Sequence, residues 1–249
     1  MLPKDLLSKR EAVSLFGITF PRLTRMEALD CILSQVYGNQ GIAVCFPDMS
    51  TLNLVYKDFA LGNLIERAFL PLNDGIGLKI ASQLQGKPFL ENLNGTDFIP
   101  ELFKQLKKGT SIFLVGSKEG VAEETRHLFQ NLFPHLDFVG SSSGYLGDQE
   151  EEKLVSQLKT LKPDVVLVGM GNPMQLHWID KQRQCAAFSH ISWFAVGGLF
   201  DFYGGSRSRA PEWMRNCCLE WLYIVLHEPH KFLRYVAGIP LFLWRTVVK

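Results

Sequence analysis

The feature that most constrains the fold is a series of short, uninterrupted apolar runs, each followed by a segment with helical periodicity. Ser111–Gly116 is such a run, and the pattern of Val121–Phe133 behind it predicts a helix. Asp164–Val168 and the helical segment Pro173–Gln184 repeat the arrangement. Because a strand buried on both faces reads as a continuous apolar run, this alternation predicts an α/β fold, with a mostly parallel sheet and helices on both faces.

The same reasoning places elements in the rest of the chain. The spacing of Thr24 and Glu27 is that of a capping box, which opens a predicted helix after the mostly apolar run Val13–Phe20. Further strands are predicted at Ile42–Phe46, Leu136–Val139 and Ser192–Val196, and further helices at Ser50–Asp58, Leu61–Phe69, Leu78–Leu84, Gly95–Lys107 and Glu150–Leu161.

Charge is distributed unevenly along the 249 residues. Residues 207–249 carry seven Lys and Arg against three acids, a net charge of +4, whereas residues 1–206 carry 19 basic against 22 acidic side chains, a net charge of −3. We therefore predict an α/β core over residues 1–206 and a basic, aromatic helical appendage over residues 207–249. Basic residues interleaved with aromatic ones suit an anionic surface, which could be a membrane, a diphosphate or a nucleic acid.

Targeting signals and cysteines point to the cytoplasm. Residues 1–5 lack the layout of a signal peptide, and no apolar run approaches the roughly 18 residues that a spanning helix needs. The five cysteines are odd in number and form no C-x-x-C pair, so we interpret them as buried thiols in a reducing compartment, not as a disulfide or zinc framework. They are Cys31, Cys45, Cys185, Cys217 and Cys218.

The stretch from Pro71 to Gly77 (PLNDGIG) places Asp74 between an apolar run and two glycines, directly before a helical pattern. Glycines after an acid allow a sharp turn and a close backbone approach to a ligand, so Asp74 is a candidate catalytic carboxylate at the end of a strand. The alternative is a purely structural turn, because Asn-Asp-Gly is ordinary turn composition.

Three predicted strands end in glycine turns. Gly116 and Ser117 follow the strand at 111, Gly169 and Gly171 follow the strand at 164, and Gly197 follows the strand at 192. Each turn offers backbone N–H groups, which can hold a phosphate without a metal. None matches the G-x-G-x-x-G or Walker pattern, so each could also be a simple turn. No Asp-x-Asp pair is present, and we expect neither a metal nor a cofactor.

Together these stretches resemble one family. The blocks that carry the resemblance are DGIG from Asp74, GTD from Gly95, VGSKEGVAE from Val115, Gly144-Tyr145, PDVVLVGMGNPMQ from Pro163, VGGLFDFYGG from Val196, RAPEWM from Arg209 and LEWLY from Leu219. They resemble, in order from about residue 13 to the end, the WecG/TagA/CpsF glycosyltransferases, which constitute glycosyltransferase family 26.

The resemblance implies a Rossmann-like core with a C-terminal helical appendage that meets the inner face of the cell membrane. It also implies an inverting, metal-independent transfer of a sugar, N-acetylmannosamine-like or another hexose, from a UDP-sugar to a polyprenyl-diphosphate-linked saccharide. By this match Asp74 is similar to the family's proposed general base, and Gln175 and Asp201 to its polar pocket residues. Lys231 and Arg234 are similar to appendage cations near the diphosphate.

Several positions depart from the family's usual pattern. Phe46 and Asp48 stand where the family has Thr and Asn, Asn92 where it has Arg, and Ile224 where it has another Arg. Asp48 and Asn92 remain candidates for substrate binding. Such changes remove hydroxyl, amide and cationic contacts, so they favour either an altered donor sugar or a weakly active relative.

These observations leave three functional hypotheses. The first is a peripheral-membrane glycosyltransferase of surface-polysaccharide synthesis that binds no nucleic acid, and the second a non-catalytic scaffold that binds a nucleotide sugar. The third, an NAD-dependent oxidoreductase, lacks the glycine fingerprint that it would need.

An apolar stripe in the appendage either faces the membrane or packs on the core or on a second subunit of a homo-oligomer. Its residues are Met214, Cys218, Trp221, Leu222 and Val225.

Overall fold

The computed structural model describes residues 12–38, 40–205, 210–211, 214, 220–227 and 238–248. Its centre is a six-stranded sheet in the order β4-β3-β8-β7-β5-β6, and every neighbouring pair of strands is parallel. The strands are β3 (Ala43–Cys45), β4 (Leu70–Pro71), β5 (Ser111–Gly116), β6 (Asp137–Ser142), β7 (Val165–Gly169) and β8 (Ser192–Ala195). This confirms the predicted α/β class with a Rossmann-like parallel sheet.

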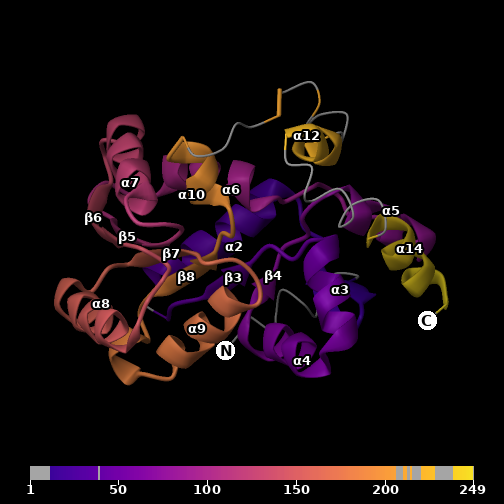
Figure 1. The fold of residues 1–249 in the computed structure, drawn as a ribbon, viewed down its shortest axis with the longest axis horizontal. Helices are drawn as coiled ribbons and strands as arrows, with labels where there is room; N and C mark the ends of the chain where they lie inside the picture. The colour runs from indigo at the N-terminus through magenta and orange to yellow at the C-terminus, as the bar shows by residue number, and fades with distance from the viewer. Residues whose placement is uncertain are drawn as a thin grey trace.

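Helices cover both faces of the sheet, as Figure 1 shows, with α2, α6, α7 and α10 on one side and α3, α4, α8 and α9 on the other. Those on the first side are α2 (Arg25–Tyr37), α6 (Gly95–Gln105), α7 (Val121–Leu132) and α10 (Leu199–Tyr203). Those on the second side are α3 (Met49–Lys57), α4 (Phe59–Ala68), α8 (Asp148–Leu161) and α9 (Met174–Arg183). The other helices in the described ranges are α5 (Ile76–Leu84), η1 (Ala186–Phe188), α12 (Glu220–His227) and α14 (Gly238–Val248).

The core is divided by the sheet into two layers. Along β5, Phe113 and Val115 pack into the layer under α8 and α9, whereas Ile112 and Leu114 pack into the layer under α2, α6 and α7. Successive side chains of a strand point to opposite faces, so a strand between two helical layers must be apolar at every position. This is the physical reason for the uninterrupted apolar runs.

The predicted capping box is present. Thr24 Oγ1 accepts from Glu27 N–H, and Glu27 Oε2 accepts from Thr24 N–H, at the start of α2. The run Val13–Phe20, in contrast, forms an antiparallel hairpin of β1 (Ala12–Leu15) and β2 (Ile18–Pro21). Phe16 and Gly17 both have positive φ, at 53° and 83°, which is the backbone of a tight two-residue turn that the apolar pattern does not reveal.

Part of the predicted appendage is packed on the core. Phe242 of α14 is fully buried, and its ring lies 5.6 Å from the ring of Phe16. Arg245 Nη1 donates to Asn53 Oδ1 of α3 at 2.7 Å, and its guanidinium lies 4.0 Å from the ring centroid of Tyr56. In Figure 1, α14 lies beside α3 and α5, whereas α12 lies apart from the sheet. No helix in the described ranges is both long and apolar enough to cross a membrane.

Candidate active site

The Asp74 turn joins β4 to α5 at the carboxyl edge of the sheet. Asp74 N–H donates to the carbonyl of Pro47 at 3.2 Å, which ties the turn to the end of β3. Gly75 has a φ of 88° and begins α5 without a side-chain cap, so a residue with a Cβ would be strained there. Asp74 itself is half-buried. The turn thus holds a carboxylate where parallel α/β sheets bind their ligands.

The other side of this turn is bound to residues 91–93. Asn73 is buried, its Nδ2 donates to the carbonyl of Glu91, and its own carbonyl accepts from Leu93 N–H. Gly75 N–H donates to Asn92 Oδ1 at 2.8 Å. Asn92, predicted as a substrate contact, therefore holds the backbone next to Asp74 with its amide oxygen.

Gln175 is the centre of a buried polar cluster between β7 and β8. Its side chain is 2% exposed, and its Oε1 accepts from the N–H groups of Gly171 at 3.2 Å and Gly197 at 3.1 Å. Its Nε2 donates to Asn172 Oδ1 at 2.7 Å, and Asn172 Nδ2 donates to Thr51 Oγ1. The N–H groups of Gly171 and Gly197 are thus engaged inside the protein.

Asp48 lies at the far end of the same chain of hydrogen bonds. Its Oδ1 accepts from both the N–H and the Oγ1 of Thr51, so the carboxylate is the N-cap of α3. Asn172 and Thr51 complete the link from Asp48 to Gln175, and sequence reasoning missed both. Asn172 stood inside the predicted glycine turn, but nothing in the pattern indicated a partner 121 residues away.

Ser117 and Asp201 meet on the other side of β7. Ser117 has a φ of 55° and its Oγ donates to Asp201 Oδ1 at 2.6 Å, which joins the turn after β5 to α10. The N–H of Ser117 donates to the carbonyl of Gly169. The structure therefore brings together two side chains that were predicted separately, from positions 84 residues apart.

Gly116 and Gly169 have a packing role. A Cβ on Gly116 would lie 2.5 Å from the backbone of Gly169, and a Cβ on Gly169 would lie 2.8 Å from the ring of Phe200. Both positions require glycine for close packing, whether or not a ligand is near.

In the part of the chain that the structure describes, the N–H groups of Lys118, Glu119 and Gly120, just before α7, donate to no acceptor.

Phe46 has a structural explanation as well. It is buried against Gly95, where a Cβ would lie 2.9 Å from its ring, and its centroid lies 5.7 Å from that of Phe98. The aromatic ring fills the space between β3 and the start of α6. Lys231 and Arg234, predicted near the diphosphate, lie outside the described residues.

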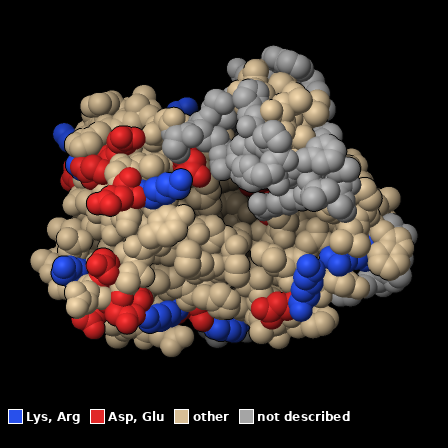
Figure 2. Space-filling model, in the orientation of Figure 1, with Lys and Arg blue, Asp and Glu red and all other residues tan. Residues whose placement is uncertain are grey.

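Acidic side chains gather on one part of the described surface. Figure 2 shows a hollow in the middle of the face seen in Figure 1, and acidic groups over α7 and α8. Glu123 in α7 accepts hydrogen bonds from Arg126 and Ser141, and these bonds lower its pKa to about 2. Within the described ranges, no group of three or more His, Cys, Asp or Glu could hold a metal ion.

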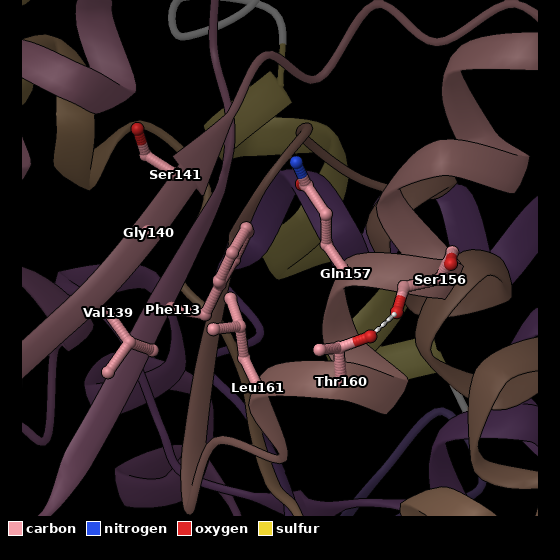
Figure 3. A pocket seen from close by; sticks show the side chains of 8 residues that line it. All are labelled: Phe113, Val139, Gly140, Ser141, Ser156, Gln157, Thr160 and Leu161. Atoms are coloured by element: carbon pink, nitrogen blue, oxygen red, sulfur yellow. Dashed lines mark hydrogen bonds between the residues drawn. The ribbon is translucent and has the colours of Figure 1, made fainter.

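A separate cavity of about 350 Å³ lies between β6 and α8. Figure 3 shows Ser141 on one wall and Ser156, Gln157 and Thr160 on the other, with Thr160 Oγ1 donating to the carbonyl of Ser156. None of the predicted site residues lines this cavity.

The carboxyl edge of this parallel sheet carries a carboxylate turn, glycine turns and buried amides. Such an edge is typical of α/β enzymes, which bind their ligands at the carboxyl ends of the strands. Residues 13–249 match the model of the glycosyl transferase WecG/TagA/CpsF family. The chain therefore belongs to this family and is a glycosyltransferase.

The curated relatives agree with this assignment. Two proteins named N-acetylglucosaminyldiphosphoundecaprenol N-acetyl-beta-D-mannosaminyltransferase, from Staphylococcus aureus strains MW2 and NCTC 8325 / PS 47, are each 28% identical over 243 residues. A protein of the same name from strain MRSA252 is 27% identical. The aligned region covers 96% of this chain and 93% of each relative.

Proposed function

We propose that this glycosyltransferase transfers a sugar from a UDP-sugar to a polyprenyl-diphosphate-linked saccharide, with inversion at the anomeric carbon and without a metal ion. The relatives' names support a lipid-diphosphate acceptor and an N-acetylmannosamine donor sugar. The observation that carries the proposal is the Asp74 turn, a half-buried carboxylate held by its backbone at the carboxyl edge of the sheet.

Asp74 is proposed as the general base. The acceptor hydroxyl attacks the anomeric carbon and gives its proton to the Asp74 carboxylate, while the bond from that carbon to the diphosphate oxygen breaks. The electron pair leaves with UDP. Attack opposite the leaving group in one displacement inverts the configuration.

The departing diphosphate needs positive partners. The N–H groups of Lys118, Glu119 and Gly120 at the start of α7 are candidates, because within the described residues they donate to no acceptor. Those of Gly171 and Gly197 are occupied by Gln175. Lys231 and Arg234 remain proposed as further cations, as the family resemblance implies.

Peripheral binding to the inner face of the cell membrane fits a lipid-linked acceptor. Leu226 of α12 is 67% exposed, and Leu241 and Trp244 of α14 are 40% and 60% exposed. Large apolar side chains on the outer faces of the last helices are suited to the interfacial region of a bilayer.

The proposal is tested with purified protein, UDP-N-acetylmannosamine, further UDP-sugars and an N-acetylglucosaminyl-diphosphate-polyprenol acceptor, with and without chelator. We expect acceptor-dependent UDP release that chelation leaves unchanged. Asp74→Asn should lower kcat by about 10²-fold or more and leave UDP binding intact, because only proton acceptance is lost.

Asp148→Asn, at the exposed start of α8, is the matched control and should keep wild-type turnover. Full activity in Asp74→Asn would reject this base. A wild-type protein that binds UDP but turns over no donor would favour the scaffold hypothesis, and loss of activity with chelator would reject metal independence.

A further inference from the structure

Residues 91–93 bind the Asp74 turn, and a side chain of α2 in turn binds residues 91–93. Residues 91–93 make three hydrogen bonds with Asn73 and Gly75, on both sides of Asp74. This segment lies outside any helix or strand, so its position depends on the groups that bind it from behind.

Arg25, the first residue of α2, supplies those groups. Its Nη2 donates to the carbonyl of Asn92 at 3.1 Å, and its Nη1 donates to Glu101 Oε1 of α6 at 2.8 Å. Its Nε lies 3.9 Å from Glu91 Oε2. The guanidinium therefore joins α2, α6 and the 91–93 segment. The capping box at Thr24 fixes the helix end from which it reaches.

We propose that Arg25 is a positioning residue for the transfer reaction: it orients the Asp74 carboxylate through Asn92, whose carbonyl it binds and whose amide oxygen holds Gly75 N–H. This inference rests on the proposed function of Asp74. Arg25 acts through Asn92 because both of its terminal nitrogens are already engaged within the protein.

The physical reason is the geometry that proton transfer demands. A general base must lie within hydrogen-bond reach of the hydroxyl it deprotonates, and a misplacement of about 1 Å can cost roughly 10²-fold in rate. Binding of the donor diphosphate does not depend on the base in this way. Loss of Arg25 should therefore lower kcat and change the KM for the donor little.

The first experiment measures amide hydrogen exchange in the full-length apo protein. Arg25→Met should accelerate exchange at Gly75 and Leu93 by about 10-fold or more, because their acceptors lie on or against the released segment. Arg25→Lys keeps one donor and should show a smaller effect. Arg67→Met, which removes an ion pair to Asp180 between α4 and α9, is the matched control and should leave both amides unchanged.

The second experiment measures kinetics in a double-mutant cycle. Arg25→Met should lower kcat by about 10- to 100-fold, with the donor KM within about threefold of wild type. In the Asp74→Asn background, Arg25→Met should lower the residual kcat no further, because the carboxylate that Arg25 orients is already gone. If Arg25 had only a structural role, Arg25→Met would lower kcat by the same factor in both backgrounds.

The outcomes separate the two proposals. Unchanged exchange at Gly75 and Leu93 in Arg25→Met, or an equal loss of kcat in both backgrounds, would overturn the role of Arg25. A wild-type protein without turnover would overturn the proposed function, and the exchange rates would still decide whether Arg25 holds the turn.

Discussion

Gln175 illustrates how a single residue can be identified from sequence while its role is not. The resemblance implied a polar pocket residue, and the structure buries its amide among three partners from two turns. Its oxygen occupies two N–H groups that were predicted to bind phosphate. The side chain thus preforms the turns after β7 and β8.

Removal of this amide should destabilise the fold. Gln175→Ala leaves the N–H groups of Gly171 and Gly197 and the oxygen of Asn172 without their partner, and each buried unsatisfied group costs about 1–3 kcal/mol. We expect a lower midpoint of urea unfolding and weaker UDP binding. Gln157→Ala, at an exposed position of α8, should leave both unchanged. Equal stability of wild type and Gln175→Ala would show that water replaces the amide.

For single residues, the sequence identified which side chains belong to the candidate site. It did not predict the contacts that these side chains make. Asp74 and Ser117 were identified from local motifs and Asp201 from the family resemblance, and all three lie at the carboxyl edge. Arg25 lies between Thr24 and Glu27 of the predicted capping box, and no role was predicted for its side chain. Its contact with Asn92 spans 67 positions, and no local pattern encodes a contact of that length.

At the scale of elements, helices and buried strands were predicted to within a few residues because their period and apolarity are local properties. A strand before Asp74 was predicted without bounds, because β4 has only two residues and they are too few for a pattern. The hairpin β1–β2 was hidden in one apolar run. The appendage was predicted as a separate helical unit, and its last helix turned out to pack against α3 and α5.

The buried contact of α14 leads to a prediction about the appendage. Phe242→Ala should lower the free energy of unfolding by about 3–5 kcal/mol, because it empties a site in the core layer next to Phe16. Trp244→Ala, two positions away and 60% exposed, should change it by no more than about 0.5 kcal/mol. Equal denaturation midpoints in the two variants would mean that α14 leaves the core in solution.

At the scale of the whole molecule, the structure has a closed core and exposed apolar side chains at its C-terminal helices. Residues 207–249 carry a net charge of +4, so full-length protein should sediment with anionic lipid vesicles at low salt and be released as salt rises, because salt screens the attraction between exposed charges. Replacing Leu226 and Trp244 by Asn should weaken sedimentation without lowering stability. Failure to bind anionic vesicles at low salt would contradict the membrane role.

The sequence by itself determined the α/β class, the positions of the buried strands, the glycine turns and the Asp74 candidate. These features follow from local periodicity, from backbone preferences and from motif spacing. Only the tertiary structure decided the strand order, the burial of Gln175 over the glycine N–H groups, and the link from Arg25 through Asn92 to the Asp74 turn. Such pairings depend on which distant segments the packed sheet brings side by side, and that arrangement is a property of the folded chain as a whole.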